Sequence, residues 1–127
     1  MPDSQYSPIS EFIIDYTEAI YDYDHHMIKS FSTRVSEKIF LGEALTKKER
    51  KSLGELDLEK SKRRLEMLDE ATEKDLLLLP SMKYQHLKGS DRYSVDADKR
   101  NSPWRITFSW ENEEMKDVEF VKIEDTH

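Results

Sequence analysis

The sequence predicts an α+β domain in which helices pack on one face of an antiparallel sheet. Apolar residues recur at helical spacing through most of residues 7–72. From residue 84 onward the spacing changes to strict alternation, and turn segments divide that part into strands. The chain has 127 residues, which suits one domain with a modest core.

Residues 7–23 form the first predicted helix, which is amphipathic. Ser7 can cap it, and Pro8 suits the first helical position because the missing N–H costs nothing there. Its apolar side chains share one face and must bury against this domain, a second copy or a partner. These side chains are Ile9, Phe12, Ile13, Tyr16, Ile20 and Tyr23.

The charge is unevenly placed along the chain. The formal net charge is -7, yet residues 1–26 carry six of the 27 acidic residues and no lysine or arginine. The rest of the chain is therefore nearly neutral, with 21 acidic against 20 basic residues. We interpret 1–26 as an acidic amphipathic extension and 27–127 as the domain proper.

One strand and three helices are predicted between the extension and the alternating part. Thr46 and Glu49 make a capping box at the start of the second of these helices, and Gly54 interrupts it. The L-L-L-L-P segment is expected to be a short buried stretch ended by its proline. The expected bounds are 27–31 for the strand, 33–41, 46–54 and 56–72 for the helices, and 76–80 for the leucine stretch.

Three strands are predicted in the last third of the chain, at 92–98, 104–110 and 117–124. In the second strand the aromatic and aliphatic residues alternate with Arg105, Thr107 and Ser109. The third is apolar on both faces for part of its length, as a central strand would be. The tryptophans are expected on the helix side and Arg105 on the other side.

Composition excludes several classes of chemistry. The chain has no cysteine, so disulfides and thiolate catalysis are excluded. The four histidines show no metal-ligand spacing, and all but His127 are expected to be surface side chains. No apolar run is long enough to span a membrane, so we expect a cytoplasmic protein without metal or cofactor.

Four cationic or titratable residues flank the predicted sheet: Lys88, Arg92, Arg105 and His127. From spacing alone, a solubilising role is the favoured interpretation of Arg105. Gathered together, however, the four would suit a phosphate, because arginine offers a planar fork of donors and histidine shuttles protons near neutral pH. RNA carries its own nucleophile, the 2'-OH, so a cationic site of this kind needs no metal to cleave it.

Six segments in order resemble the HigB toxins of the RelE/ParE superfamily of bacterial toxin–antitoxin systems. They cover most of residues 27–127 and end, as the family usually does, on a histidine. The segments are M-I-K-S-F at 27–31, L-D-E-A-T-E-K-D-L at 68–76, L-K-G at 87–89, D-R-Y-S-V at 91–95, W-R-I-T-F-S-W-E-N at 104–112 and D-V-E-F-V-K-I-E-D-T-H at 117–127.

The resemblance implies a RelE-like fold and a metal-independent endoribonuclease that cleaves mRNA on the ribosome. It also implies neutralisation by a HigA-like helix-turn-helix antitoxin. By motif, Arg105 would stabilise the transition state, Lys88 would contact phosphate or transfer a proton, and His127 would act as acid or base. Asp125 is the carboxylate before that histidine. The candidate RNA contacts are Arg92, Lys83 and Gln85.

Three alternatives remain open from the sequence. The protein could be a non-catalytic ParE-like toxin that binds and inhibits a topoisomerase. Arg105 could pair with Asp96, Asp98 or a strand neighbour, and His127 could be a frayed terminus. The acidic extension could fold over the cationic face as an RNA mimic, although packing of its apolar face is the favoured interpretation.

Overall fold

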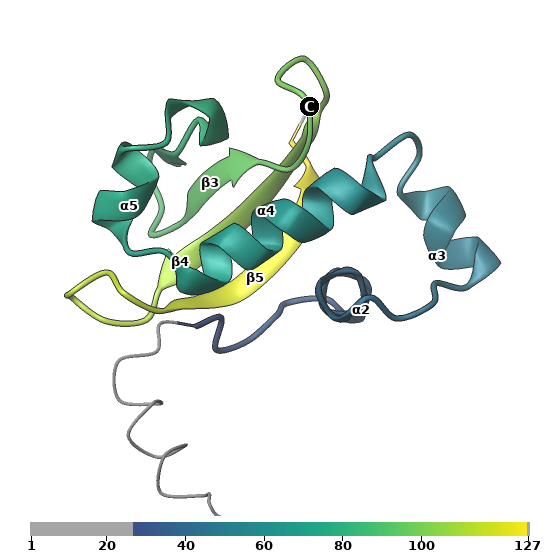
Figure 1. Ribbon diagram of the computed structural model, residues 1–127, viewed down its shortest axis with the longest axis horizontal. Coiled ribbons are helices and arrows are strands. Elements are labelled where there is room, and N and C mark those ends of the chain that lie inside the picture. The colour runs from purple at the N-terminus through teal and green to yellow at the C-terminus, as the bar shows by residue number, and fades with distance from the viewer. Residues whose placement is uncertain (1–26, 127) are drawn as a thin grey trace, which may run out of the picture.

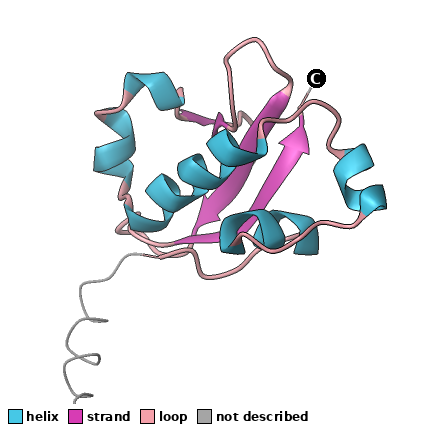
Figure 2. Cartoon of the chain, turned by 45° about the vertical axis from the view of Figure 1, so that its right-hand side comes forward, coloured by secondary structure: helices cyan, strands magenta, loops and turns pink. Residues whose placement is uncertain are grey.

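The computed structural model describes residues 27–126, which contain four α-helices, one 3-10 helix and a four-stranded antiparallel sheet (Figure 1). The predicted α+β class is therefore confirmed. Figure 2 shows α4 and α2 on the same face of the sheet. The predicted extension at 1–26, its helix at 7–23 and the terminal His127 lie outside the described residues.

The sheet has the strand order β2-β3-β4-β5, so each strand pairs with its neighbour in the chain. Their bounds are Gln85–His86 for β2, Tyr93–Asp96 for β3, Trp104–Trp110 for β4 and Val118–Asp125 for β5. The bounds of β4 match the predicted strand. The pairing of β4 with β5 shifts register between Thr107 and Ser109, which indicates a β-bulge.

The segment 27–31, predicted as a strand, lies beside β5 but forms no regular ladder. It makes two isolated parallel bridges, Ile28 to Val118 and Phe31 to Val121. Some backbone N–H groups that would bond to a neighbouring strand in a regular ladder donate to side chains instead. The Ile28 N–H donates to the Asp69 carboxylate at 2.7 Å, and the Phe120 N–H donates to the Ser30 hydroxyl at 2.9 Å.

A side chain caps the start of each described α-helix. Thr33 caps α2 (Arg34–Leu41), which ends at Gly42 with a φ of 74°. The predicted capping box of Thr46 and Glu49 is present at α3 (Lys47–Ser52). The remaining helices are α4 (Leu58–Glu70), α5 (Glu73–Leu77) and the 3-10 helix η1 (Pro80–Met82).

The core lies between the helices and the inner face of the sheet. Leu65 and Leu68 of α4 and Ile106 and Phe108 of β4 are fully or almost fully buried in it. At one end it continues as an aromatic cluster, made of Tyr84, Tyr93, Phe108 and Trp110. Burial raises the pKa of Tyr84 far above its usual value, and the hydrogen bond to Glu73 raises it further.

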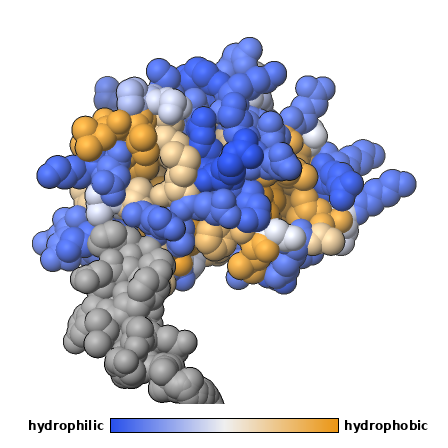
Figure 3. All heavy atoms as spheres, in the orientation of Figure 1, coloured by the Kyte–Doolittle hydropathy of each residue, from blue (hydrophilic) through white to orange (hydrophobic). Residues whose placement is uncertain are grey.

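The leucine stretch differs from the prediction. Leu76 is buried, but Leu77 and Leu78 are 64% and 72% exposed. The reason is that α5 is short, so only its Leu76 faces the core and the following residues project outward. Hydrophobic surface gathers over α5 and around α2 and α3 in Figure 3. Among the described helices, none combines the length and apolar character that crossing a bilayer requires.

Candidate functional site

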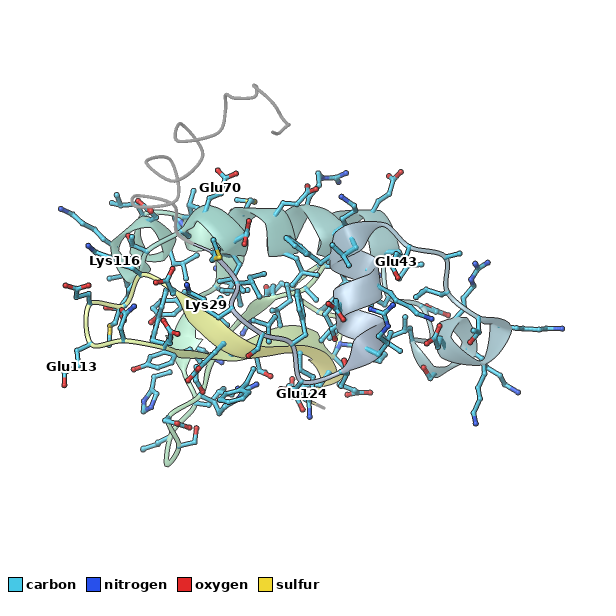
Figure 4. The ribbon with its side chains drawn as sticks, turned by 90° about the horizontal axis from the view of Figure 1, so that it is seen from below. Lys29, Glu43, Glu70, Glu113, Lys116 and Glu124 are labelled. Atoms are coloured by element: carbon cyan, nitrogen blue, oxygen red, sulfur yellow. The ribbon has the colours of Figure 1, made fainter. Side chains whose placement is uncertain are left out.

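The sheet face away from the helices is polar. Because side chains alternate along a strand, the buried apolar residues of β3, β4 and β5 define the inner face, and the residues between them lie on the outer one. We call this outer set the polar sheet face. Its members are Ser94, Asp96, Arg105, Thr107, Ser109, Lys122 and Glu124. In Figure 4, Glu124 lies at the end of β5 on the side away from α4.

Several residues of the polar sheet face are hidden from solvent although no helix in the described part of the chain covers them (Figure 2). Ser94, Asp96, Thr107 and Ser109 are each at most 5% exposed. A buried hydroxyl or carboxylate needs a hydrogen-bond partner, and two arginines supply such partners to Asp96, Thr107 and Ser109. These arginines, Arg92 and Arg105, are described in turn.

Arg92 lies over the middle of β4. Its guanidinium donates to the Thr107 hydroxyl at 3.0 Å and to the Ser109 hydroxyl at 3.3 Å. The Thr107 hydroxyl in turn donates to the Glu124 carboxylate. These two bonds use two of the five N–H donors of a guanidinium, so three have no partner among residues 27–126 and can meet a ligand. Arg92 is therefore a fixed cation with spare donors on an open sheet face.

Arg105 is held much more completely. Its Nη1 donates to the carbonyl oxygens of Ser102 and Trp104, and its Nη2 donates to that of Arg100. Its Nε lies 3.3 Å from Asp96, and the side chain is only 15% exposed. Four of its five N–H donors are thus engaged. The pairing with Asp96 is the alternative that the sequence left open, and it ties Arg105 to the loop between β3 and β4.

Lys88 lies at the tip of the β2–β3 hairpin, far along the sheet from Arg105. The hairpin is closed by the Leu87 N–H, which donates to the Arg92 carbonyl at 2.8 Å. Arg105 pairs with Asp96 at the far end of β3, so the two cations flank opposite ends of β4. The four-residue interval from Arg105 to Ser109 alone spans about 13 Å. Lys88 is exposed and has no salt bridge within residues 27–126.

The C-terminal end lies beside the Arg105 loop. Asp125 pairs with Trp104, and Thr126 bonds the Pro103 carbonyl through its N–H at 2.9 Å and through its hydroxyl at 3.2 Å. His127 lies outside the described residues. Of the predicted catalytic residues, Arg105 and Asp125 thus occupy one end of the sheet and Lys88 the other.

The two remaining candidate RNA contacts lie in different places. Gln85 pairs with Ser94 and is exposed, so it is at the edge of the polar sheet face. Lys83 follows η1 with a φ of 56° and is also exposed. Gln85 therefore joins Arg92 on one surface, whereas Lys83 precedes the strand on a separate turn.

Sequence reasoning missed three residues near these candidates. Lys122 lies opposite Thr107 on the polar sheet face. Its position between the apolar Val121 and Ile123 indicates, by strand alternation, that it faces away from the core. His86, two residues before Lys88, packs its ring on Tyr93 at 4.8 Å and belongs to the inner-face side. The third residue, Phe120, lies at the β-bulge.

No protein-family model matches the chain, and a search of curated proteins finds no match either.

Proposed function

We propose that the protein is an endoribonuclease toxin of a type II toxin–antitoxin system, which cleaves mRNA in the cytoplasm and thereby inhibits translation. Three things support the proposal: the ordered resemblance to HigB toxins, the helices gathered on one side of the sheet, and the polar sheet face left open on the other. The proposed partners are mRNA, the ribosome and a HigA-like helix-turn-helix antitoxin.

The observation that carries the proposal is the position of Arg92. A guanidinium fixed by two hydroxyls, with three donors left, is suited to hold a phosphate without first losing side-chain freedom. Lys122 and Gln85 lie on the same face and could extend the contact along a strand of RNA. With the 2'-OH as nucleophile, such positioning and charge stabilisation would be the protein's main contribution.

Within this proposal, Arg92 is better suited than Arg105 to contact the phosphate. Arg105 has one N–H donor left and would act as a positioning residue that holds the β3–β4 loop and the adjoining C-terminal end. Proton transfer is assigned to His127 with Asp125, and Lys88 is assigned to a neighbouring phosphate because it flanks the other end of β4.

The test is expression of the full chain in bacteria as wild type, Arg92→Gln and Arg63→Gln. Arg63 is exposed on α4, so it serves as a matched control for loss of one arginine charge. We expect growth arrest and cut mRNA from the wild type and the control. Loss of a charged hydrogen-bonding group should lower cleavage by Arg92→Gln about ten- to hundred-fold. Equal cleavage by all three would remove Arg92 from the proposal, and no cleavage by the wild type would remove the nuclease.

A non-catalytic toxin that binds a topoisomerase is the second candidate. The observation favouring it is the engagement of Arg105 by four groups, together with its separation from Lys88 along the sheet. Growth arrest with intact mRNA, accompanied by inhibition of a purified topoisomerase, would select this candidate.

A further inference from the structure

Phe120 occupies a backbone conformation that its side chain does not favour. Its φ is 54°, in the left-handed region, at the β-bulge where the pairing of β4 and β5 shifts. For a bulky residue this conformation is an outlier, and glycine is the usual choice at such a bulge. The conformation is held by the Phe120 N–H, which donates to the Ser30 hydroxyl at 2.9 Å.

The strain is not offset by burial of the ring. Phe120 is 52% exposed, whereas Val118 and Val121 on either side of it are 1% and 0% exposed. The bulge therefore turns the large side chain out of the core layer while its neighbours stay in it. Folding alone does not account for an aromatic residue here, since an exposed ring adds little to stability.

The surroundings of the ring suit an anionic, aromatic ligand. Glu119, the residue before it, pairs with Ser109, whose hydroxyl accepts a hydrogen bond from Arg92. Two residues further along β5 is Lys122, opposite Thr107. In the register of β5, the exposed ring thus follows Glu119, opposite the Ser109 that Arg92 binds, and precedes Lys122 by two residues. Lys122 lies 3.5 Å from Glu124, so a phosphate would compete with that carboxylate for it. An exposed ring with cations nearby along the strands is the combination that binds single-stranded nucleic acid through base stacking and phosphate contacts.

We propose that Phe120 is the stacking platform for one base of a single-stranded RNA whose phosphates are held by Arg92 and Lys122. This inference rests on the proposed function, because it takes RNA as the ligand of the polar sheet face. It adds a positioning residue to which the resemblance assigned no role. Every base has a π face, so the contact orients the strand without choosing a sequence.

The test uses the full chain and a 2'-O-methyl oligoribonucleotide, which cannot be cleaved, with 2-aminopurine at successive positions. Wild type, Phe120→Gly, Phe120→Leu and Phe120→Trp are compared by affinity, by 2-aminopurine quenching and by thermal midpoint. We expect the glycine and leucine variants to bind about ten-fold more weakly and to lose quenching at one position. The tryptophan variant should keep both affinity and quenching.

The glycine variant separates stacking from a structural role. Glycine relieves the positive φ, so its thermal midpoint should equal or exceed that of the wild type while RNA binding falls. A lower midpoint, or wild-type affinity in the glycine or leucine variant, would overturn the inference. Unchanged RNA affinity with lost neutralisation by the antitoxin would assign the ring to a protein partner instead. Failure of the wild type to bind RNA would overturn the proposed function itself.

Discussion

Arg105 and Asp96 face each other across β4 and β3, with Nε and Oδ1 3.3 Å apart. The same carboxylate oxygen accepts from Arg100 at 2.7 Å, but the side chain of Arg100 is 56% exposed and that of Arg105 only 15%. The two arginines therefore share a partner and differ in burial. Because of that difference, comparing the two arginines measures what the Arg105 contacts contribute to the free energy of unfolding.

Arg105→Ala should destabilise the fold strongly, whereas Arg100→Ala should hardly change it. The first removes four contacts and leaves the buried Asp96 with one exposed partner, at a cost of about 2–4 kcal/mol. The second removes a solvent-screened pair worth roughly 0–1 kcal/mol. Urea unfolding of both variants gives the two free energies. Equal values would mean that the guanidinium of Arg105 is free to serve a ligand.

The stability of the protein should fall in alkaline solution through Tyr84. Its pKa in the folded state is raised above the ordinary value of 10.0 by burial and by Glu73. The unfolded chain then loses this proton first, so the contribution is complete below pH of about 10 and is lost as the pH rises above it. Unfolding free energies between pH of about 8 and 11 should show a steeper decline for the wild type than for Tyr84→Phe. Parallel curves would contradict the assignment.

Ser36 links α2 to β5 and should be sensitive to removal of one oxygen atom. It is 1% exposed, and its hydroxyl accepts from the Ile123 N–H at 2.9 Å. Ser36→Ala leaves that buried N–H without its partner, which should cost about 1–3 kcal/mol. Ser52→Ala, in the exposed last turn of α3, is the control and should cost less than about 0.5 kcal/mol. A small effect at Ser36 would show that water replaces the hydroxyl.

A chain starting at Met27 should fold with a cooperative transition. All the buried hydrophobic residues found in the described part of the chain lie between Ile39 and Ile123. Circular dichroism melting of the full and shortened chains tests this domain assignment. Cleavage rates of the same two proteins test the RNA-mimic hypothesis for the extension: a faster shortened chain would support it, and equal rates would remove it.

Local chemistry made much of the fold predictable from the sequence. The capping box at Thr46 and the alternation of residues 104–110 depend on neighbours within a few residues, and both are present in the structure. Such features need no knowledge of the tertiary fold, because the partner of each group is close in sequence.

The features that were missed depend on partners far along the chain. The bulge at Phe120 needs the hydroxyl of Ser30, which is 90 residues away. The exposure of Leu77 depends on which side of α5 meets the sheet. Likewise, alternation placed Arg105 on the outer face but did not show that backbone carbonyls of the neighbouring loop would take most of its donors.

The two edges of the sheet differ in how their backbone N–H and C=O groups are paired. Beside β5, residues 27–32 make four backbone hydrogen bonds with that strand. The N–H groups of Lys29 and Ser32 donate to it, and the carbonyls of Met27 and Ser30 accept from it. The opposite margin is β2, which has two residues, Gln85 and His86, both exposed and polar. A strand this short offers too few consecutive partners to template another chain. Among the described residues, the short edge strand thus discourages edge-to-edge aggregation.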